Sequence, residues 1–224
     1  MKNKSIYVQY GCGFSTGAGW ENFDSSPTLR IERIPLLGMP LSSFFSGNAS
    51  RFPASVRYGD VRKGLLVADG TVRGCFASHV LEHLSLEDLR RALVNTFRML
   101  RPEGIFRLIV PDLHERACRY IAEVGSKSPD AAATFLRSTR LGHEQRPRTP
   151  MQYLRQLIGG STHLWMWDEY SMSAELKGAG FVNIRKCQFG DSLDPMFSKV
   201  EHKRQFFDEL HEIAECAIEA QKPA

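Results

Sequence analysis

Residues 5–24, SIYVQYGCGFSTGAGWENFD, place a glycine turn directly after an apolar run and then end on an acidic residue. Residues 5–10 predict a strand that Gly11 and Gly13 end, and residues 20–24 predict a second short strand that ends at Asp24. Glycine lets the chain turn with positive φ and lets a ligand approach the backbone closely. A carboxylate after the second strand can accept hydrogen bonds from two ribose hydroxyls. The stretch therefore indicates a pocket for a nucleoside-type cofactor, although a GxG turn alone is as compatible with a turn that binds nothing.

The rest of the chain alternates short apolar strands with amphipathic helices. Ser85 can cap the clearest helix, and its apolar residues recur at helical spacing. The predicted strands are residues 55–60, 71–77, 105–110 and 181–189, and the predicted helices are residues 85–100, 113–124 and 166–179. We expect an α/β fold, a Rossmann-like and mostly parallel sheet with helices on both faces and a small helical cap.

Length, composition and charge set broad limits. A chain of 224 residues suits one domain, residues 1–224, with residues 113–165 as a cap or insertion within it. Five scattered cysteines without a CxxC pair argue against a zinc ribbon and fit a reducing compartment. The sequence contains no signal peptide or membrane-spanning run, so we expect a cytoplasmic protein without a membrane partner. A net charge of +4 is too small to predict a nucleic-acid partner, and the oligomeric state is left open.

Candidate polar residues follow several predicted strands. Asp60 ends the third predicted strand, Ser78 and His79 follow the fourth, and Asp112 follows the fifth. Ligands of open parallel sheets bind at the carboxyl ends of the strands, so these side chains are expected to meet Gly11, Gly13 and Asp24 at one edge.

These segments, in this order, resemble the class I S-adenosylmethionine (SAM) methyltransferases, in particular small bacterial predicted methyltransferases. The resemblance rests on GCG and GWENFD, a strand ending in GD, SHVLEHL, a helix, and RPEGIFRLIVPD, and covers residues 5–112 with a second match at 163–168 and 177–185. It implies SAM as cofactor and a final strand around residues 210–219, although residues 201–220 also read as a helix. The implied SAM-binding residues are Gly11 and Gly13 for the methionine part, Asp24 for the ribose, Asp60 and Val61 for the adenine, and Ser78 and His79 beside the sulfonium.

The chain departs from the family pattern at three places. Gln9 replaces the acid that usually precedes the first glycine, and Arg73 replaces the acid common in the fourth strand. Ten residues separate Gly13 from Asp24, against about 20 in dinucleotide folds, so the first helix is expected to be very short or missing. These departures bear on the affinity for SAM rather than on the fold.

His79, Glu82 and His83 spell H-x-x-E-H, which is also the zinc signature of inverted metalloproteases. That motif should lie in a long helix, whereas here it follows a strand. Some methyltransferases resemble this segment with E-x-x-E-H and bind Mg²⁺, but His79 replaces the first glutamate and a hard cation prefers oxygen. We therefore expect no metal, with Glu82 and His83 bracing the following helix.

The insertion suggests the acceptor side. It is rich in arginine, and the planar guanidinium suits phosphate or carboxylate, so Arg146 and Arg148 are candidate substrate-binding residues, although a solvated basic face fits equally well. His79 and His163 are candidate catalytic bases. We expect a SAM-dependent methyltransferase acting on a hydroxyl or amine of a small or glycan/nucleotide-sugar-type acceptor. The alternatives are a non-catalytic methyltransferase-like binding module and an RNA methyltransferase.

Overall fold

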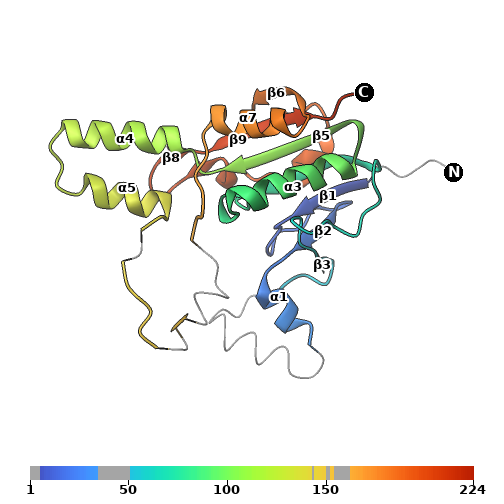
Figure 1. Ribbon diagram of the computed structural model, residues 1–224, viewed down its shortest axis with the longest axis horizontal. Coiled ribbons are helices and arrows are strands. Elements are labelled where there is room, and N and C mark those ends of the chain that lie inside the picture. The colour runs from blue at the N-terminus through green and yellow to red at the C-terminus, as the bar shows by residue number, and fades with distance from the viewer. Residues whose placement is uncertain (1–5, 35–50, 143, 150–151, 154–161) are drawn as a thin grey trace.

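The computed structural model describes residues 6–34, 51–142, 144–149, 152–153 and 162–224. Seven strands form one sheet and two short strands form a hairpin, as Figure 1 shows in part. The strands are β1 (Ile6–Tyr10), β2 (Glu21–Asp24), β3 (Val56–Tyr58), β4 (Val72–Ser78), β5 (Leu100–Val110), β6 (Val182–Lys186), β7 (Phe207–Asp208), β8 (Ile213–Ala214) and β9 (Cys216–Gln221).

The sheet has the strand order β3-β2-β1-β4-β5-β9-β6. The first five strands in this order are parallel, and β9 runs antiparallel between β5 and β6. The chain reverses direction across the sheet between β1 and β4, so the carboxyl ends of these two neighbours form the switch point where ligands bind in such sheets. The predicted mostly parallel, Rossmann-like sheet is confirmed.

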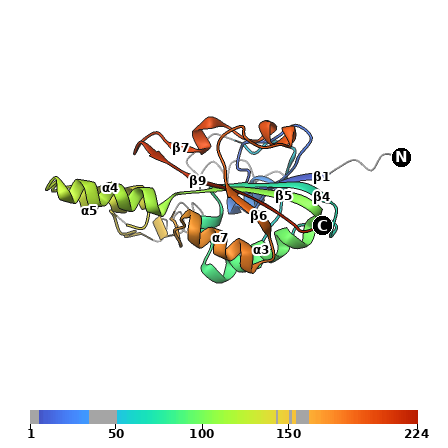
Figure 2. The ribbon, with the colours of Figure 1, turned by 90° about the horizontal axis from the view of Figure 1, so that it is seen from above.

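The helices cover the two faces of the sheet unequally. Figure 2 shows α3 and α7 together on one face, while the segment leading to β7 lies over the other. The helices are α1 (Pro27–Glu32), α3 (Leu86–Met99), α4 (Leu113–Gly125), α5 (Ala131–Thr139) and α7 (Glu169–Gly178), with 3₁₀ turns η1 (Leu81–His83), η2 (Pro195–Lys199) and η3 (Lys203–Gln205).

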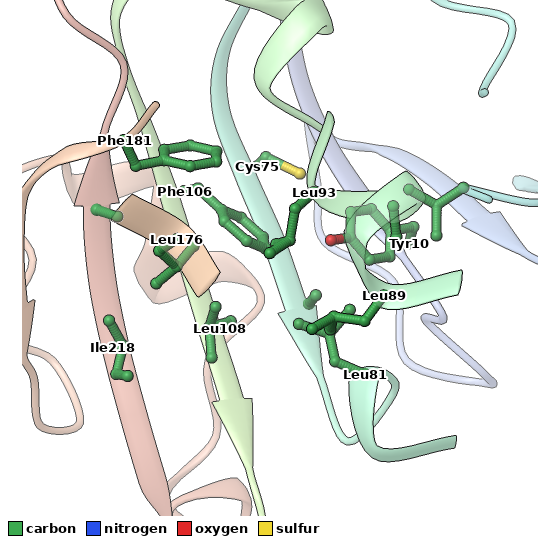
Figure 3. Packing of buried hydrophobic residues seen from close by; sticks show 14 of the residues in the cluster. Tyr10, Cys75, Leu81, Leu89, Leu93, Phe106, Leu108, Leu176, Phe181 and Ile218 are labelled. Atoms are coloured by element: carbon green, nitrogen blue, oxygen red, sulfur yellow. The ribbon is translucent and has the colours of Figure 1, made fainter. Parts of the chain in front are cut away.

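The face under α3 and α7 is apolar. Leu89 and Leu93 of α3 and Leu176 of α7 are fully buried against Phe106 and Leu108 of β5 (Figure 3). Ser85 caps α3 by accepting a hydrogen bond from the Asp88 amide, as expected. Burial of such side chains contributes about 1.5–3 kcal/mol each, so this layer is the main hydrophobic core.

The opposite face contains a buried charged group. Arg107 of β5 is fully buried and donates hydrogen bonds to Glu201 at 2.7 Å and Glu219 at 2.7 Å. Arg73, where the resemblance leads us to expect an acid, donates to Asp194 at 2.9 Å, and Tyr7 donates to the same carboxylate at 2.8 Å. Segment 187–206 is thus fixed to the sheet by ion pairs as well as by Phe197.

The structure decides three details of the predicted elements, and one of them, the start of α7, is a correction. The tail is a strand, because residues 216–221 insert between β5 and β6, so the alternative helix over 201–220 is wrong. Helix α7 begins at Glu169 rather than 166, because Asp168 and Ser171 form a capping box. Residues 11–20 contain no helix, as the short spacing to Asp24 predicted.

The insertion after β5 contains a helical hairpin. Helices α4 and α5 pack side by side and project beyond the sheet in both Figure 1 and Figure 2. Arg116 of α4, only 2% exposed, donates to Glu215 at 2.9 Å and to Asp208 at 3.2 Å, and so joins the hairpin to the β7–β9 segment.

Among the described residues, no helix combines the length and the apolar character that spanning a bilayer requires.

Candidate functional site

The carboxyl ends of the parallel strands bring together most of the predicted site residues. Gly11 follows β1, Asp24 ends β2, and Ser78 ends β4 beside Tyr10 and Ala77 at the switch point. This edge has two parts. We call the ends of β1, β2 and β3 the cofactor edge, and the ends of β4 and β5 with the start of β9 the acceptor edge.

Both glycines of the turn have left-handed backbone. Gly11 has φ of 62° and Gly13 has φ of 54°, a conformation that costs other L-residues about 1–2 kcal/mol. A Cβ on Gly11 would lie 2.1 Å from Cγ2 of Val80, so this glycine also allows the turn after β4 to pack against the turn after β1. A Cβ on Gly13 would meet no described atom within 4 Å, so the backbone there has open space beside it.

Asp24 is bound to the glycine turn. Its Oδ2 accepts a hydrogen bond from the amide of Gly13 at 2.9 Å, and its Oδ1 accepts one from the amide of Ser26 at 2.7 Å. The carboxylate is largely buried. Each carboxylate oxygen can accept more than one hydrogen bond, so the group retains acceptor capacity for a diol.

Asp60 and Val61 follow β3; Asp60 is paired with a charged side chain, whereas Val61 lies in the apolar core. Asp60 accepts a bidentate pair of hydrogen bonds from Arg62, both at 2.8 Å. Burial alone would raise the pKa of Asp60, but the hydrogen bonds and charge of Arg62 outweigh it and lower that pKa. Val61 is buried in the main core, and its carbonyl accepts a hydrogen bond from Asn95 at 2.8 Å. The adenine-binding role of both residues stays a prediction.

Ser78 and His79 end β4 at the junction of the two edges. The buried Oγ of Ser78 has no hydrogen-bond partner in the described part of the chain. His79 has a left-handed φ of 54°, and its Nε2 donates to the carbonyl oxygen of Gln205 at 2.9 Å. This bond leaves Nδ1 facing Glu82, with 3.6 Å between Nδ1 and Oε1.

A cavity of about 550 Å³ opens at the acceptor edge. Its walls come from the turn after β4, from the α4–α5 hairpin, from residue 163 and from the β7–β9 segment, and include His79, Glu82, His163, Arg140, Arg204 and Glu215. The volume suits a small molecule, and the lining offers several polar groups.

Glu82 and the histidines around it lie deep in this cavity wall. Glu82 is 1% exposed, and neither of its carboxylate oxygens has a hydrogen-bond partner among the described residues. Its backbone carbonyl accepts from the amides of Leu164 and Trp165, which holds residue 163 next to η1. The rings of His83 and His163 lie 5.1 Å apart in an edge-to-face arrangement.

The two candidate bases differ in their electrostatics. Burial lowers the pKa of His163 to about 4, so it is neutral at pH 7 and a weak proton acceptor. Burial also acts to lower the pKa of His79, but Glu82 and the Gln205 carbonyl outweigh it and raise that pKa.

Arg146 and Arg148, the predicted substrate-binding residues, are exposed and do not line the cavity. The arginines that do line it are Arg116, Arg137, Arg140 and Arg204. Arg116 is bound by Glu215 and Asp208, and Arg137 by Glu144, whereas Arg140 and Arg204 form no ion pair within the described ranges. Sequence reasoning missed Arg204 because it lies in the tail, far from the insertion.

The cofactor edge, together with Ser78 at the adjoining end of β4, fits a SAM molecule by its chemistry. Gly13 offers open backbone, Asp24 offers a carboxylate beside it, and the orphaned hydroxyl of Ser78 points to a missing polar partner. Gln9, in place of the usual acid, is buried, and its Oε1 also lacks a partner among the residues described. These residues would hold SAM between the ends of β1, β2 and β4.

Residues 41–108 match the family described as "Methyltransferase domain". The matched region runs through β3, β4 and α3 into β5, and it contains Asp60, Ser78 and His79 but not the glycine turn. The predicted resemblance to methyltransferases is confirmed over this part of the chain, and SAM is the cofactor that the resemblance implies. No curated protein matches the sequence.

Solved structures similar to the chain share little sequence with it. A SAM-dependent methyltransferase from Methanosarcina mazei is 13% identical, with a TM-score of 0.49, and the match covers 100% of this chain and 94% of that one. One from Archaeoglobus fulgidus is 16% identical, with a TM-score of 0.47 and coverage of 98% and 88%. Phosphoethanolamine N-methyltransferase 2 of Haemonchus contortus, solved with phosphomonomethylethanolamine and S-adenosylhomocysteine, is 13% identical, with a TM-score of 0.48 and coverage of 100% and 50%.

Proposed function

We propose that this methyltransferase-domain chain transfers a methyl group from SAM to a hydroxyl or amine of a small, anionic acceptor of the glycan or nucleotide-sugar type. The observation that carries the proposal is the cavity of about 550 Å³ that adjoins the cofactor edge at His79. A reacting pair must be aligned and shielded from water, and a pocket next to the ends of β1 and β4 provides that position.

The cofactor edge would bind and orient SAM. Asp24 would accept hydrogen bonds from the ribose hydroxyls while it fixes the glycine turn through Gly13. Ser78 would supply a hydroxyl from the end of β4. When bound, SAM supplies an electrophilic methyl group on its sulfonium, so the protein needs to add only position, desolvation and a proton acceptor.

We propose His79 as the base that takes the proton from the hydroxyl or amine of the substrate to be methylated. It lines the cavity, its Nε2–H is engaged by Gln205, and its Nδ1 is the nitrogen left to accept a proton. His163, the other candidate, is buried and weakly basic, which disfavours it for this step.

Arg140 and Arg204 are the proposed anion-binding residues. They face one cavity from two distant segments, and an arginine can bind a phosphate or carboxylate at two points. Residues 113–165 would then act as a cap over the acceptor, with the α4–α5 hairpin forming one wall.

The test is methyl transfer from radiolabelled SAM to a panel of nucleotide-sugars and sugar phosphates, with the product identified by mass spectrometry. Arg140→Glu/Arg204→Glu should raise the acceptor KM at least about 10-fold, because a charge-assisted pair contributes about 1.5–3 kcal/mol. The matched control, Arg146→Glu/Arg148→Glu, makes the same charge change outside the cavity and should alter KM less than about twofold. An equal effect of the two pairs would reject the anionic acceptor site.

A further inference from the structure

Glu82, His83 and His163 form a cluster of potential metal ligands in the cavity wall. One ligand atom from each of the three residues lies within 4.8 Å of the other two. Glu82 and His83 belong to η1, and His163 comes from a distant part of the chain that the Glu82 carbonyl holds in place through the amides of Leu164 and Trp165.

Glu82 is a buried carboxylate whose charge has no close partner in the described structure. Its nearest basic atoms are Nδ1 of His79 at 3.6 Å and Nε2 of His83 at 3.9 Å, both beyond hydrogen-bond distance. A buried carboxylate without hydrogen bonds is costly, so such a group in a native protein calls for a missing partner.

The two imidazoles are arranged as ligands would be. Nδ1 of His83 lies 3.0 Å from the carbonyl oxygen of Thr162, which can only accept, so Nδ1 is the donor and Nε2, 3.9 Å from Oε1 of Glu82, is the nitrogen available to a metal ion. Metal-bound histidines are typically oriented by a hydrogen bond of this kind on the other nitrogen. Nδ1 of His163, a residue that is 5% exposed, has no partner among the described residues.

We propose that Glu82, His83 and His163 bind a divalent first-row transition-metal ion. Two nitrogens and one carboxylate suit such an ion better than Mg²⁺ or Ca²⁺, which prefer oxygen ligands. Ligand bonds of about 2.0–2.2 Å place neighbouring ligand atoms about 3–3.5 Å apart, so a pair of ligand atoms 4.8 Å apart needs to approach by about 1.3–1.8 Å. From the sequence we expected no metal, because the H-x-x-E-H motif alone did not suggest a suitable ligand set. The third ligand of this cluster, His163, lies outside that motif.

Three protein ligands leave coordination positions open, and the cluster lines the same cavity as His79. If the proposed function holds, an ion here would bind an oxygen of the methyl-accepting substrate, next to His79, the proposed proton acceptor. The metal site itself does not depend on that function, because it can be measured without SAM or acceptor.

The experiment is titration of the EDTA-treated, dialysed full chain with Co²⁺, followed by its visible absorption and by metal analysis. We expect a single Co²⁺ per chain, bound through nitrogen and oxygen. Glu82→Gln, His83→Gln and His163→Gln should each weaken binding at least about 10-fold, since even indirect partners of a ligand contribute that much. Should a variant unfold, the wild-type Tm still reports binding, and we expect Co²⁺ or Zn²⁺ to raise it by about 5 °C.

The matched control is His114→Gln/Cys118→Ser. Nε2 of His114 and Sγ of Cys118 lie 3.6 Å apart on the exposed side of α4 and are a competing site for a soft ion. This variant should bind Co²⁺ like the wild type. Absence of Co²⁺ from the wild type, loss of binding in the control alone, or equal affinity for Mg²⁺ would overturn the proposal. Failure of methyl transfer would leave it intact.

Discussion

The cofactor edge and the acceptor edge lie side by side in one sheet but are built by different means. The cofactor edge comes from consecutive strands, and contacts with the backbone fix it. Asp24 accepts hydrogen bonds from two backbone amides, and the missing side chain of Gly11 lets Val80 pack against the glycine turn. The acceptor edge comes from segments far apart in the sequence, and buried charges such as Arg116 and Glu215 hold it together. A site made of backbone turns leaves a motif in the sequence, whereas a site made of long-range ion pairs does not.

The largest effect is expected from breaking the acceptor edge at Arg116. Arg116→Met should lower the free energy of unfolding by about 3–5 kcal/mol, because it leaves Glu215 buried without its partner. Urea denaturation measures the change. Arg116→Met/Glu215→Leu should recover part of the loss, since it removes both members of the buried ion pair and leaves neither of them unpaired.

The control for Arg116 is Arg119, one turn later on α4. Its ion pair with Glu123 and its hydrogen bond to the carbonyl of His211 are both partly exposed, so Arg119→Met should cost about 1 kcal/mol or less. Equal losses at Arg116 and Arg119 would mean that buried charge is not what holds the acceptor edge.

At the cofactor edge, Gly11→Ala should destabilise the fold by about 2–4 kcal/mol. The left-handed backbone contributes about 1–2 kcal/mol of this loss and the collision with Val80 the remainder. Gly13→Ala has the same backbone strain but open space, so it should cost only about 1–2 kcal/mol. Thermal unfolding of both variants, and of Gly11→Ala/Val80→Ala as a rescue, measures the difference; a rescue that restores nothing would argue against the contact.

The smallest change in stability is expected at Asp60, which forms an ion pair with Arg62 at the cofactor edge. Because Arg62 lowers the folded-state pKa of Asp60, the pair stabilises the fold above the ordinary carboxyl pKa of about 3.9, and this contribution is lost as the pH falls through the folded-state value. Arg62→Gln should therefore reduce stability at pH 7 by about 1 kcal/mol or less, since Arg62 is partly exposed. The difference between variant and wild type should shrink at pH 3, and a difference that grows there would contradict the pairing.

The fold could be predicted because short sequence patterns, such as apolar runs and a helix cap, indicated the strands and helices that the structure contains. Apolar runs ended by glycine, an acid or, for β4, by Ser78 marked β1 to β5, and Ser85 marked the start of α3. The last strand was ambiguous because residues 201–220 carry helical spacing as well. Its strand conformation is decided by the gap between β5 and β6, a tertiary effect that no local window contains.

The site could be predicted only in part for the same reason. Gly11, Gly13, Asp24 and Ser78 followed from strand ends, and the structure brings them to one edge. Arg146 and Arg148 were chosen for their charge, but the cavity is lined by Arg140 and Arg204 instead. The meeting of Glu82 with His163 was also invisible, because it depends on two backbone hydrogen bonds from residues 164 and 165.

The most direct test of the account is calorimetric binding of S-adenosylhomocysteine to the wild type, to Asp24→Ala and to Arg140→Glu/Arg204→Glu. The wild type should bind. Asp24→Ala should weaken binding by about 1–3 kcal/mol through the loss of charged hydrogen bonds, with folding checked by circular dichroism. The arginine variant should bind like the wild type, because its residues belong to the acceptor edge. Absence of binding to the wild type, or unchanged binding to Asp24→Ala, would contradict the placement of SAM at the ends of β1 and β2.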